Sequence, residues 1–215
     1  MGESSQSRAQ VTLASDSRVR LLAELQRAHP QTSDQLAARL GLHRNTVREH
    51  LARLSSTGFV ISEREQRTER GRPKVLFSPA EGLSGENPTA GEQTRSALAL
   101  GRAYRSAFPD ATPTDRREQL DVLDDHLDRC GFQPRMNADG TTVRLICPFA
   151  DLFEDMDVEL CRVHLRLIRS VLARVPGELE ADGLAPAGAD GSCVLHLRSA
   201  ACPPRALPEA RPAHP

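Results

Sequence analysis

Apolar residues recur every three or four positions early in the chain and predict two short helices. The first runs from Ser17 to about Ala28, where Pro30 stops it. The second covers residues 34–40, is capped by the threonine or serine before it, and ends at Gly41. Because glycine readily adopts a left-handed backbone conformation, Gly41 predicts a tight turn into the next element.

A third helix and two strands follow. Residues 44–56 carry an apolar stripe at helical spacing, which turns the polar residues of this helix outward. Two short strands are predicted over residues 60–65 and 74–78, separated by a polar, basic loop. Helix, capped helix, glycine turn, basic helix and a two-stranded wing form the pattern of a winged helix-turn-helix domain, here at residues 16–79.

The rest of the chain predicts a second, smaller domain over residues 92–200. Its expected elements are helices at 93–107 and 115–130, a hairpin with its turn at 137–140, a helix at 157–174 and a strand at 193–198. The predicted fold class is α+β: an N-terminal winged helix-turn-helix domain and a small C-terminal α+β sensor domain that contains the cysteines.

Three segments have the composition of loops. We expect disorder in residues 1–15 and in the proline-rich tail 201–215, and a linker at residues 80–91. No apolar run is long enough to cross a membrane, and the N-terminus lacks the apolar middle section of a secretory signal. We therefore expect a cytosolic protein with no membrane partner.

The charges are divided unevenly between the two predicted domains. Residues 18–77 carry 12 basic and 6 acidic side chains, a net charge of +6, whereas residues 78–215 have a net charge of −6. A basic domain favours a polyanionic partner, because arginine and lysine neutralise the phosphates of nucleic acids. Double-stranded DNA is therefore the expected partner of the first domain.

The polar face of the third helix and the wing contain the candidates for base and phosphate contacts. They are Arg44, Asn45, Thr46, Arg48 and Arg53 on the helix, and Arg70, Arg72 and Lys74 on the wing. Glu49 lies on the same face and has two readings: it accepts a hydrogen bond from a cytosine amine, or it pairs with Arg53 on the helix surface.

The five cysteines differ in their positions along the predicted elements. Cys130 continues an apolar helical stripe and Cys202 lies in the proline-rich tail, so neither requires a special role. Cys147 ends a strand, Cys161 lies in the first turns of a helix, and Cys193 begins the last strand. One pole of a small domain is able to collect these three thiols.

Packing and metal binding both explain these residues. His164 follows Cys161 by three residues, so its imidazole reaches whatever the thiolate binds. Each of the three cysteines also falls within an apolar stripe, where a cysteine acts as a small hydrophobic residue. The chain has no compact CxxC pair of the kind found in structural zinc sites.

Two parts of the chain resemble known families of bacterial regulators. The segment TSDQLAARLGLHRNTVREHLARLSSTGFV and the later GRPKVLFSP resemble the DNA-binding domains of ArsR- and MarR-like proteins. The run ICPFADLFEDMDVELCRVHLRLIRSVL, followed by GSCVLHL, resembles the C-terminal domain of SufR-like iron-sulfur transcriptional regulators.

The second resemblance implies a cofactor and a role. It implies an iron-sulfur cluster held by Cys147, Cys161 and Cys193, with His164, another side chain or a small molecule as the fourth ligand. It further implies a repressor of cluster-assembly genes. A homodimer on a DNA operator is expected because paired recognition helices match half-sites one helical turn apart, and the helix at 93–107 is the candidate seam.

Three rival readings stay open. The same residues, Cys147, Cys161, Cys193 and His164, are suited to zinc, or the thiols act alone as a redox switch. A winged helix is also used for protein contacts, which predicts an adaptor. An enzyme is not expected, because the sequence has no glycine-rich phosphate loop, no HExxH and no GxSxG motif.

Overall fold

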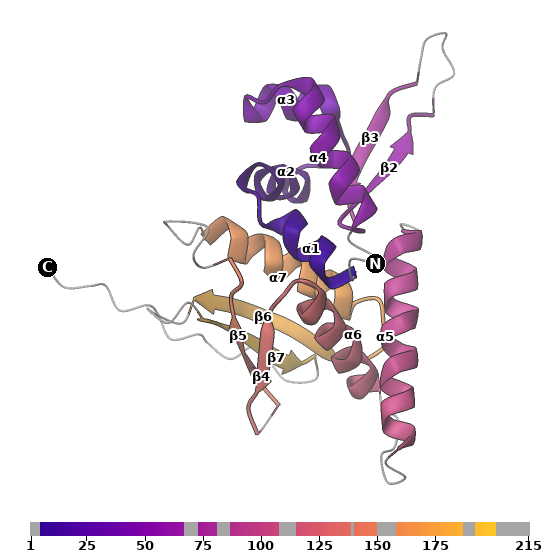
Figure 1. The fold of residues 1–215 in the computed structure, drawn as a ribbon, viewed down its shortest axis with the longest axis vertical. Coiled ribbons are helices and arrows are strands. Elements are labelled where there is room, and N and C mark those ends of the chain that lie inside the picture. Colours follow the sequence, from indigo (N-terminus) through magenta and orange to yellow (C-terminus); the bar gives the residue numbers. More distant parts are fainter. Residues whose placement is uncertain are drawn as a thin grey trace, which may run out of the picture.

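Figure 1 shows the computed structural model, in which a domain of short helices and a wing stands on a layer of helices and sheet. The structure describes residues 5–66, 73–80, 87–107, 115–138, 140–149, 158–186 and 192–200. Within these ranges the chain is α+β, as predicted.

Three helices form the core of the N-terminal domain: α2 (Asp16–Arg27), α3 (Ser33–Leu40) and α4 (Arg44–Ser56). Thr32 caps α3 in a capping box with Gln35, so each side chain accepts a hydrogen bond from the other residue's backbone N–H. Gly41 ends α3 in the left-handed conformation, with φ of 66°.

The wing is a three-stranded antiparallel sheet rather than a two-stranded one. Its strands are β1 (Gln31–Thr32), β2 (Val60–Arg64) and β3 (Val75–Pro79), in the order β1-β3-β2. The short strand β1 was not predicted, because two residues carry no alternation that a pattern is able to reveal.

The C-terminal domain contains three helices and an antiparallel sheet of four strands. The helices are α5 (Pro88–Ser106), α6 (Asp115–Arg129) and α7 (Val158–Leu172). The strands are β4 (Gln133–Met136), β5 (Thr142–Ile146), β6 (Leu179–Pro186) and β7 (Ser192–Ser199), in the order β4-β5-β7-β6.

A continuous apolar core joins the two domains. Fully buried leucines of α2 and α4, such as Leu22 and Leu51, belong to the same cluster as Leu145 of β5 and Ile168 of α7. Helix α7 touches α2 of the first domain and both α6 and β6 of its own domain. Because interiors are close-packed, a shift of α7 would also displace the side chains of α2 that pack against it.

The N-terminal segment is more ordered than its composition predicts. Instead of disorder through residue 15, the structure has helix α1 (Ser5–Leu13), which packs against α6 and α2. Ala9 and Leu13 are buried in the shared core, so tertiary packing stabilises a segment with weak local signals. Ser17 lies inside α2, and Ser15 is the N-cap residue.

Two further boundaries differ from the prediction. Helix α5 begins at Pro88, inside the expected linker, because Asn87 caps it and proline suits the first helical turn. Strand β6 replaces the loop expected after α7, since Leu179 and Ala181 alternate into the core and pair with β7. A register shift between Ala181 and Gly183 interrupts the alternation and hides the strand from pattern analysis.

Among the described residues, none of the helices is long and apolar enough to cross a membrane.

Candidate functional site

Helix α4 presents a polar face on a rigid apolar base. Val47, Leu51 and Leu54 are fully buried, whereas Arg48 and Arg53 are exposed on the other side. A helix held in this way is able to enter a major groove without losing its orientation.

The other predicted contact residues of α4 lie in its first turn. Arg44 and Asn45 are exposed and Thr46 is partly buried. The Arg44 guanidinium is 2.6 Å from the Asp34 carboxylate of α3, an exposed ion pair that the pattern did not predict. This pair joins the first turns of the two helices that form the turn motif.

Two of the remaining predictions for this face have different outcomes. Glu49 and Arg53 are both exposed on α4, and among the described residues no ion pair joins them, so the pairing of Glu49 with Arg53 gains no support. Lys74 is exposed immediately before β3. Arg70 and Arg72 lie outside the described residues.

The thiols of Cys147, Cys161 and Cys193 come together in the C-terminal domain. Strands β5 and β7 are antiparallel neighbours with Leu145 opposite Cys193, so Cys147, two residues further on, lies diagonally across from Cys193. The Cys193 side chain hydrogen-bonds with Cys147 and with Cys161 of α7. The Cys193 thiol is therefore close to a residue at a strand end and to a residue of a helix, although the three cysteines are not among the groups of described residues whose ligand atoms all lie within 4.8 Å of one another.

The chemistry of these three residues fits a thiophilic metal or an iron-sulfur cluster. Hydrogen bonds with Cys147 and Cys161, followed by burial, raise the pKa of the Cys193 thiol above its ordinary value. If these thiols lost their protons, the negative charges would repel one another unless a cation compensated them. Thiolate sets of this kind are the ligands of iron-sulfur clusters and of zinc.

His164 belongs to a different group from the one predicted. Its ring lies with the side chains of His126 and Cys130, and one ligand atom from each of the three lies within 4.8 Å of the others. Burial lowers the pKa of His164 to about 4. The expectation that His164 completes the three-cysteine site therefore gains no support from the contacts of the described residues.

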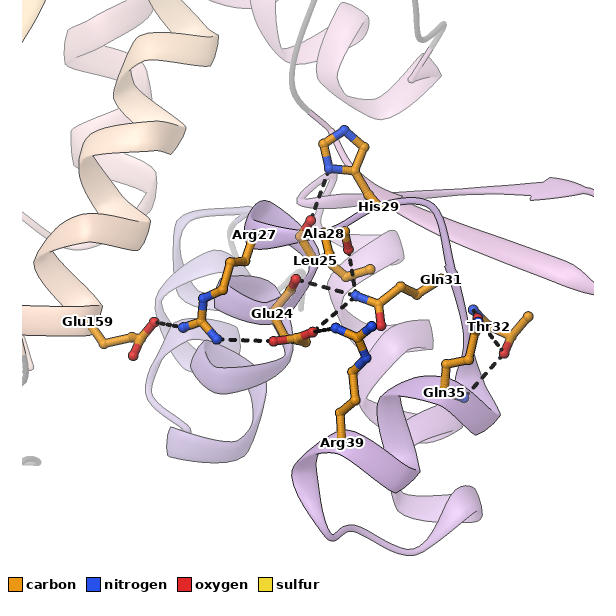
Figure 2. Close-up of polar contacts among 10 residues, drawn as sticks. All are labelled: Glu24, Leu25, Arg27, Ala28, His29, Gln31, Thr32, Gln35, Arg39 and Glu159. Carbon is orange, nitrogen blue, oxygen red and sulfur yellow. Dashed lines mark hydrogen bonds and ion pairs between the residues drawn. The ribbon is translucent and has the colours of Figure 1, made fainter.

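A polar network connects the start of α7 to the turn motif (Figure 2). Arg27 of α2 bridges Glu159 of α7, at 2.8 Å, and Glu24 of its own helix, at 3.1 Å. Glu24 is buried and also accepts from Arg39 of α3, at 2.6 Å. Glu159 lies two residues before Cys161, so the network links the helix that carries this thiol to both helices that support α4.

Backbone groups of the two domains are also joined. The Gln26 side chain of α2 donates to the Val163 carbonyl of α7, at 3.4 Å, and Arg166 of α7 donates to the Gln26 carbonyl. Ser170 of α7 and Arg174, two residues after this helix, donate to the Ala80 carbonyl, just after the wing, at 3.1 and 3.2 Å. Helix α7 is therefore bonded to the last turn of α2 and to the residue that follows the wing.

The comparison with protein families finds a match in the N-terminal domain. Residues 13–63 match a family described as a helix-turn-helix domain. The matched range spans α2 to β2 and so contains the turn between α3 and α4. This match supports a DNA-binding transcriptional regulator with an ArsR-like winged helix-turn-helix domain. No curated protein matches the chain.

Sequence reasoning missed the group of His126, Cys130 and His164. The available signal was the spacing of His126 and Cys130, four residues apart and therefore on one side of α6. The apolar stripe of α6 predicts that Cys130 packs in the core, and Cys130 is buried. The partnership with His164 depends on how α6 packs on α7, which the linear pattern does not reveal.

Proposed function

We propose that this protein is a SufR-like transcriptional repressor whose C-terminal domain binds an iron-sulfur cluster and responds to iron supply or oxidants. The observation that supports the proposal is the proximity of the Cys193 thiol to Cys147 and to Cys161, the latter on a helix that touches the DNA-binding domain. When bound, a cluster supplies a redox-sensitive centre whose presence depends on iron and on oxidants.

The chain's own residues provide the route from that centre to DNA. Cys161 lies on α7, and the neighbouring residues Glu159 and Arg166 bond to α2. A change in the position of α7 alters these bonds and with them the support of α4. Two states of the α2–α7 contact therefore correspond to two orientations of the recognition helix.

Helix α5 supports a homodimer. Leu100 and Tyr104 are about 70% exposed, although large apolar side chains are usually covered. They border a cleft of about 600 Å³ that continues over Pro134 and Met136 of β4. A second copy that covers this face would supply the second recognition helix that paired half-sites require. Leu100→Glu should then yield monomers in light scattering, and an unchanged mass would exclude this seam.

Iron content tests the cluster directly. Protein purified without oxygen should be brown and contain iron and acid-labile sulfide. Cys147→Ser, Cys161→Ser and Cys193→Ser should each lower the iron content, while Cys130→Ser serves as the matched control and should not. Colourless wild-type protein that contains zinc instead would refute the cluster in favour of a zinc site.

DNA binding tests the other half of the proposal. Binding to a palindromic fragment of its own promoter should weaken steeply with salt, because arginine contacts displace counterions from phosphates. Arg48→Ala should weaken binding, whereas Arg20→Ala, an exposed arginine of α2, should not. Equal affinity of both variants and of wild type would favour a winged helix used for protein contacts.

A further inference from the structure

A second group of metal-ligating side chains lies between α6 and α7. His126 and Cys130 are one turn apart on α6, with 3.9 Å between the Nε2 of His126 and the Sγ of Cys130. A ring nitrogen of His164 on α7 completes a set whose ligand atoms all lie within 4.8 Å of one another. Three ligands of a single ion have separations of this size.

One polar atom on these three residues lacks a hydrogen-bond partner. The Nε2 of His164 is buried and makes no hydrogen bond with any described residue. His164 is only 2% exposed; its ring packs edge-on against Phe132, with 4.6 Å between ring centroids, and stacks on Phe149, at 5.9 Å. Buried nitrogens are rarely left without a partner, so a bound ion would satisfy an atom that packing alone leaves unpaired.

The ligand set and its surroundings indicate which ion fits. Two neutral imidazoles and one thiolate supply a single negative charge, which balances a monovalent ion but leaves a divalent ion with an excess positive charge in a buried site. Arg129 and Arg174 both act electrostatically on His126, and Asp125, which pairs with Arg129 at 2.7 Å, offsets one of these two positive charges. Among the described residues, no carboxylate joins the group.

The number of ligands also favours a monovalent ion. Soft thiolate and imidazole ligands suit monovalent copper, whereas structural zinc sites almost always use four protein ligands. We propose that His126, Cys130 and His164 form a buried binding site for Cu⁺, separate from the three cysteines of the proposed cluster. This inference goes beyond the proposed function and stands without it, since the two sites share no residue.

The position of the site couples it to the N-terminal segment. Gly131 follows Cys130, and a Cβ atom placed on it would lie 2.6 Å from the Cδ of Gln10 in α1. Helix α1 therefore packs directly against the turn that ends α6. An ion that ties α6 to α7 fixes the surface on which α1 rests, so Cu⁺ should also protect α1 from proteolysis.

The test is a competition for Cu⁺ without oxygen, in which the full chain removes the ion from a coloured copper-chelator complex. The background variant replaces Cys147, Cys161 and Cys193 by serine, which removes the other described thiols that bind copper. This background should take up one Cu⁺ per chain. Adding His126→Gln, Cys130→Ser or His164→Gln should each lower the affinity at least about tenfold. His196→Gln, a partly buried histidine of β7, is the matched control.

A second measurement keeps the proposal testable if the variant with three cysteines replaced by serine does not fold. In the wild-type chain, His164→Gln should remove one equivalent of bound Cu⁺ and the imidazole scattering in copper X-ray absorption, while all cysteines stay in place. Unchanged copper content and spectrum in His126→Gln and His164→Gln would overturn the proposal. A preference of the same three residues for Zn²⁺ over Cu⁺ would overturn it as well.

Failure of this site is distinguishable from failure of the cluster. Cys130→Ser should lose copper and keep iron, whereas Cys161→Ser should lose iron and keep copper at the His126 site. Loss of both metals in both variants would refute two separate sites, and iron-free protein that still binds Cu⁺ would refute only the cluster.

Discussion

Arg166→Met tests whether the contact between α7 and α2 transmits a signal. The substitution keeps an unbranched apolar side chain but removes the hydrogen bond from the Arg166 guanidinium to the Gln26 carbonyl. A charge-assisted hydrogen bond of this partly exposed kind contributes about 1.5 kcal/mol. Since 1.4 kcal/mol corresponds to a factor of ten, its loss changes the ratio of two DNA affinities by at most about tenfold.

The assay measures DNA affinity with iron-loaded and iron-free protein. We expect the ratio between the two affinities to move towards one in Arg166→Met, with a loss of about 1.5 kcal/mol in urea unfolding. Arg162→Met, at an exposed position of the same helix, is the control and should leave the ratio unchanged. If Arg166→Met lowers stability while the ratio stays at the wild-type value, transmission through this contact is refuted.

Three other predictions concern stability and are measured by urea unfolding. Gln119→Leu removes three buried hydrogen bonds, to the Leu172 carbonyl and to both backbone groups of Leu179, and should cost about 3 kcal/mol; a loss below 1 kcal/mol would contradict these bonds. Glu24→Gln removes the charge that Arg27 and Arg39 share and should cost about 1 to 2 kcal/mol, whereas wild-type stability would show that the network contributes nothing. Partial burial and then Asp128, Asp125 and Asp121 raise the pKa of Asp124, so its carboxylate destabilises the fold at neutral pH, and this cost disappears as the pH falls through the folded pKa. Asp124→Asn should therefore stabilise the protein at pH 7 by less than about 1 kcal/mol, with a smaller gain at pH 4; a gain that grows towards acid pH would contradict this sign.

Local sequence signals were sufficient to predict the helix-turn-helix. Helix α4 begins and ends at the predicted residues, because an apolar stripe, a preceding turn and a following glycine all indicate the same boundaries. Helix α1 and strand β6 have no comparable set of sequence signals that indicate the same boundaries. Ala9 and Leu13 are buried in the core where α1 packs against α6 and α2, and β6 is interrupted by the register shift near Gly183.

The candidate site was predictable only in part. The apolar pattern along the chain predicts that Cys147, Cys161 and Cys193 lie near the ends of their strands and helix. The antiparallel pairing of β5 with β7 then brings Cys147 close to Cys193. The partner of His164 was not predictable, because the neighbour across a helix–helix contact depends on how α6 and α7 pack.

The most direct test of the account compares one preparation of wild-type protein before and after removal of its iron, with binding to promoter DNA as the readout. The account predicts that the two forms differ in affinity by about 5- to 150-fold, and that Cys161→Ser behaves as the iron-free form under both conditions. Equal affinities of the iron-loaded and iron-free wild-type protein would contradict it.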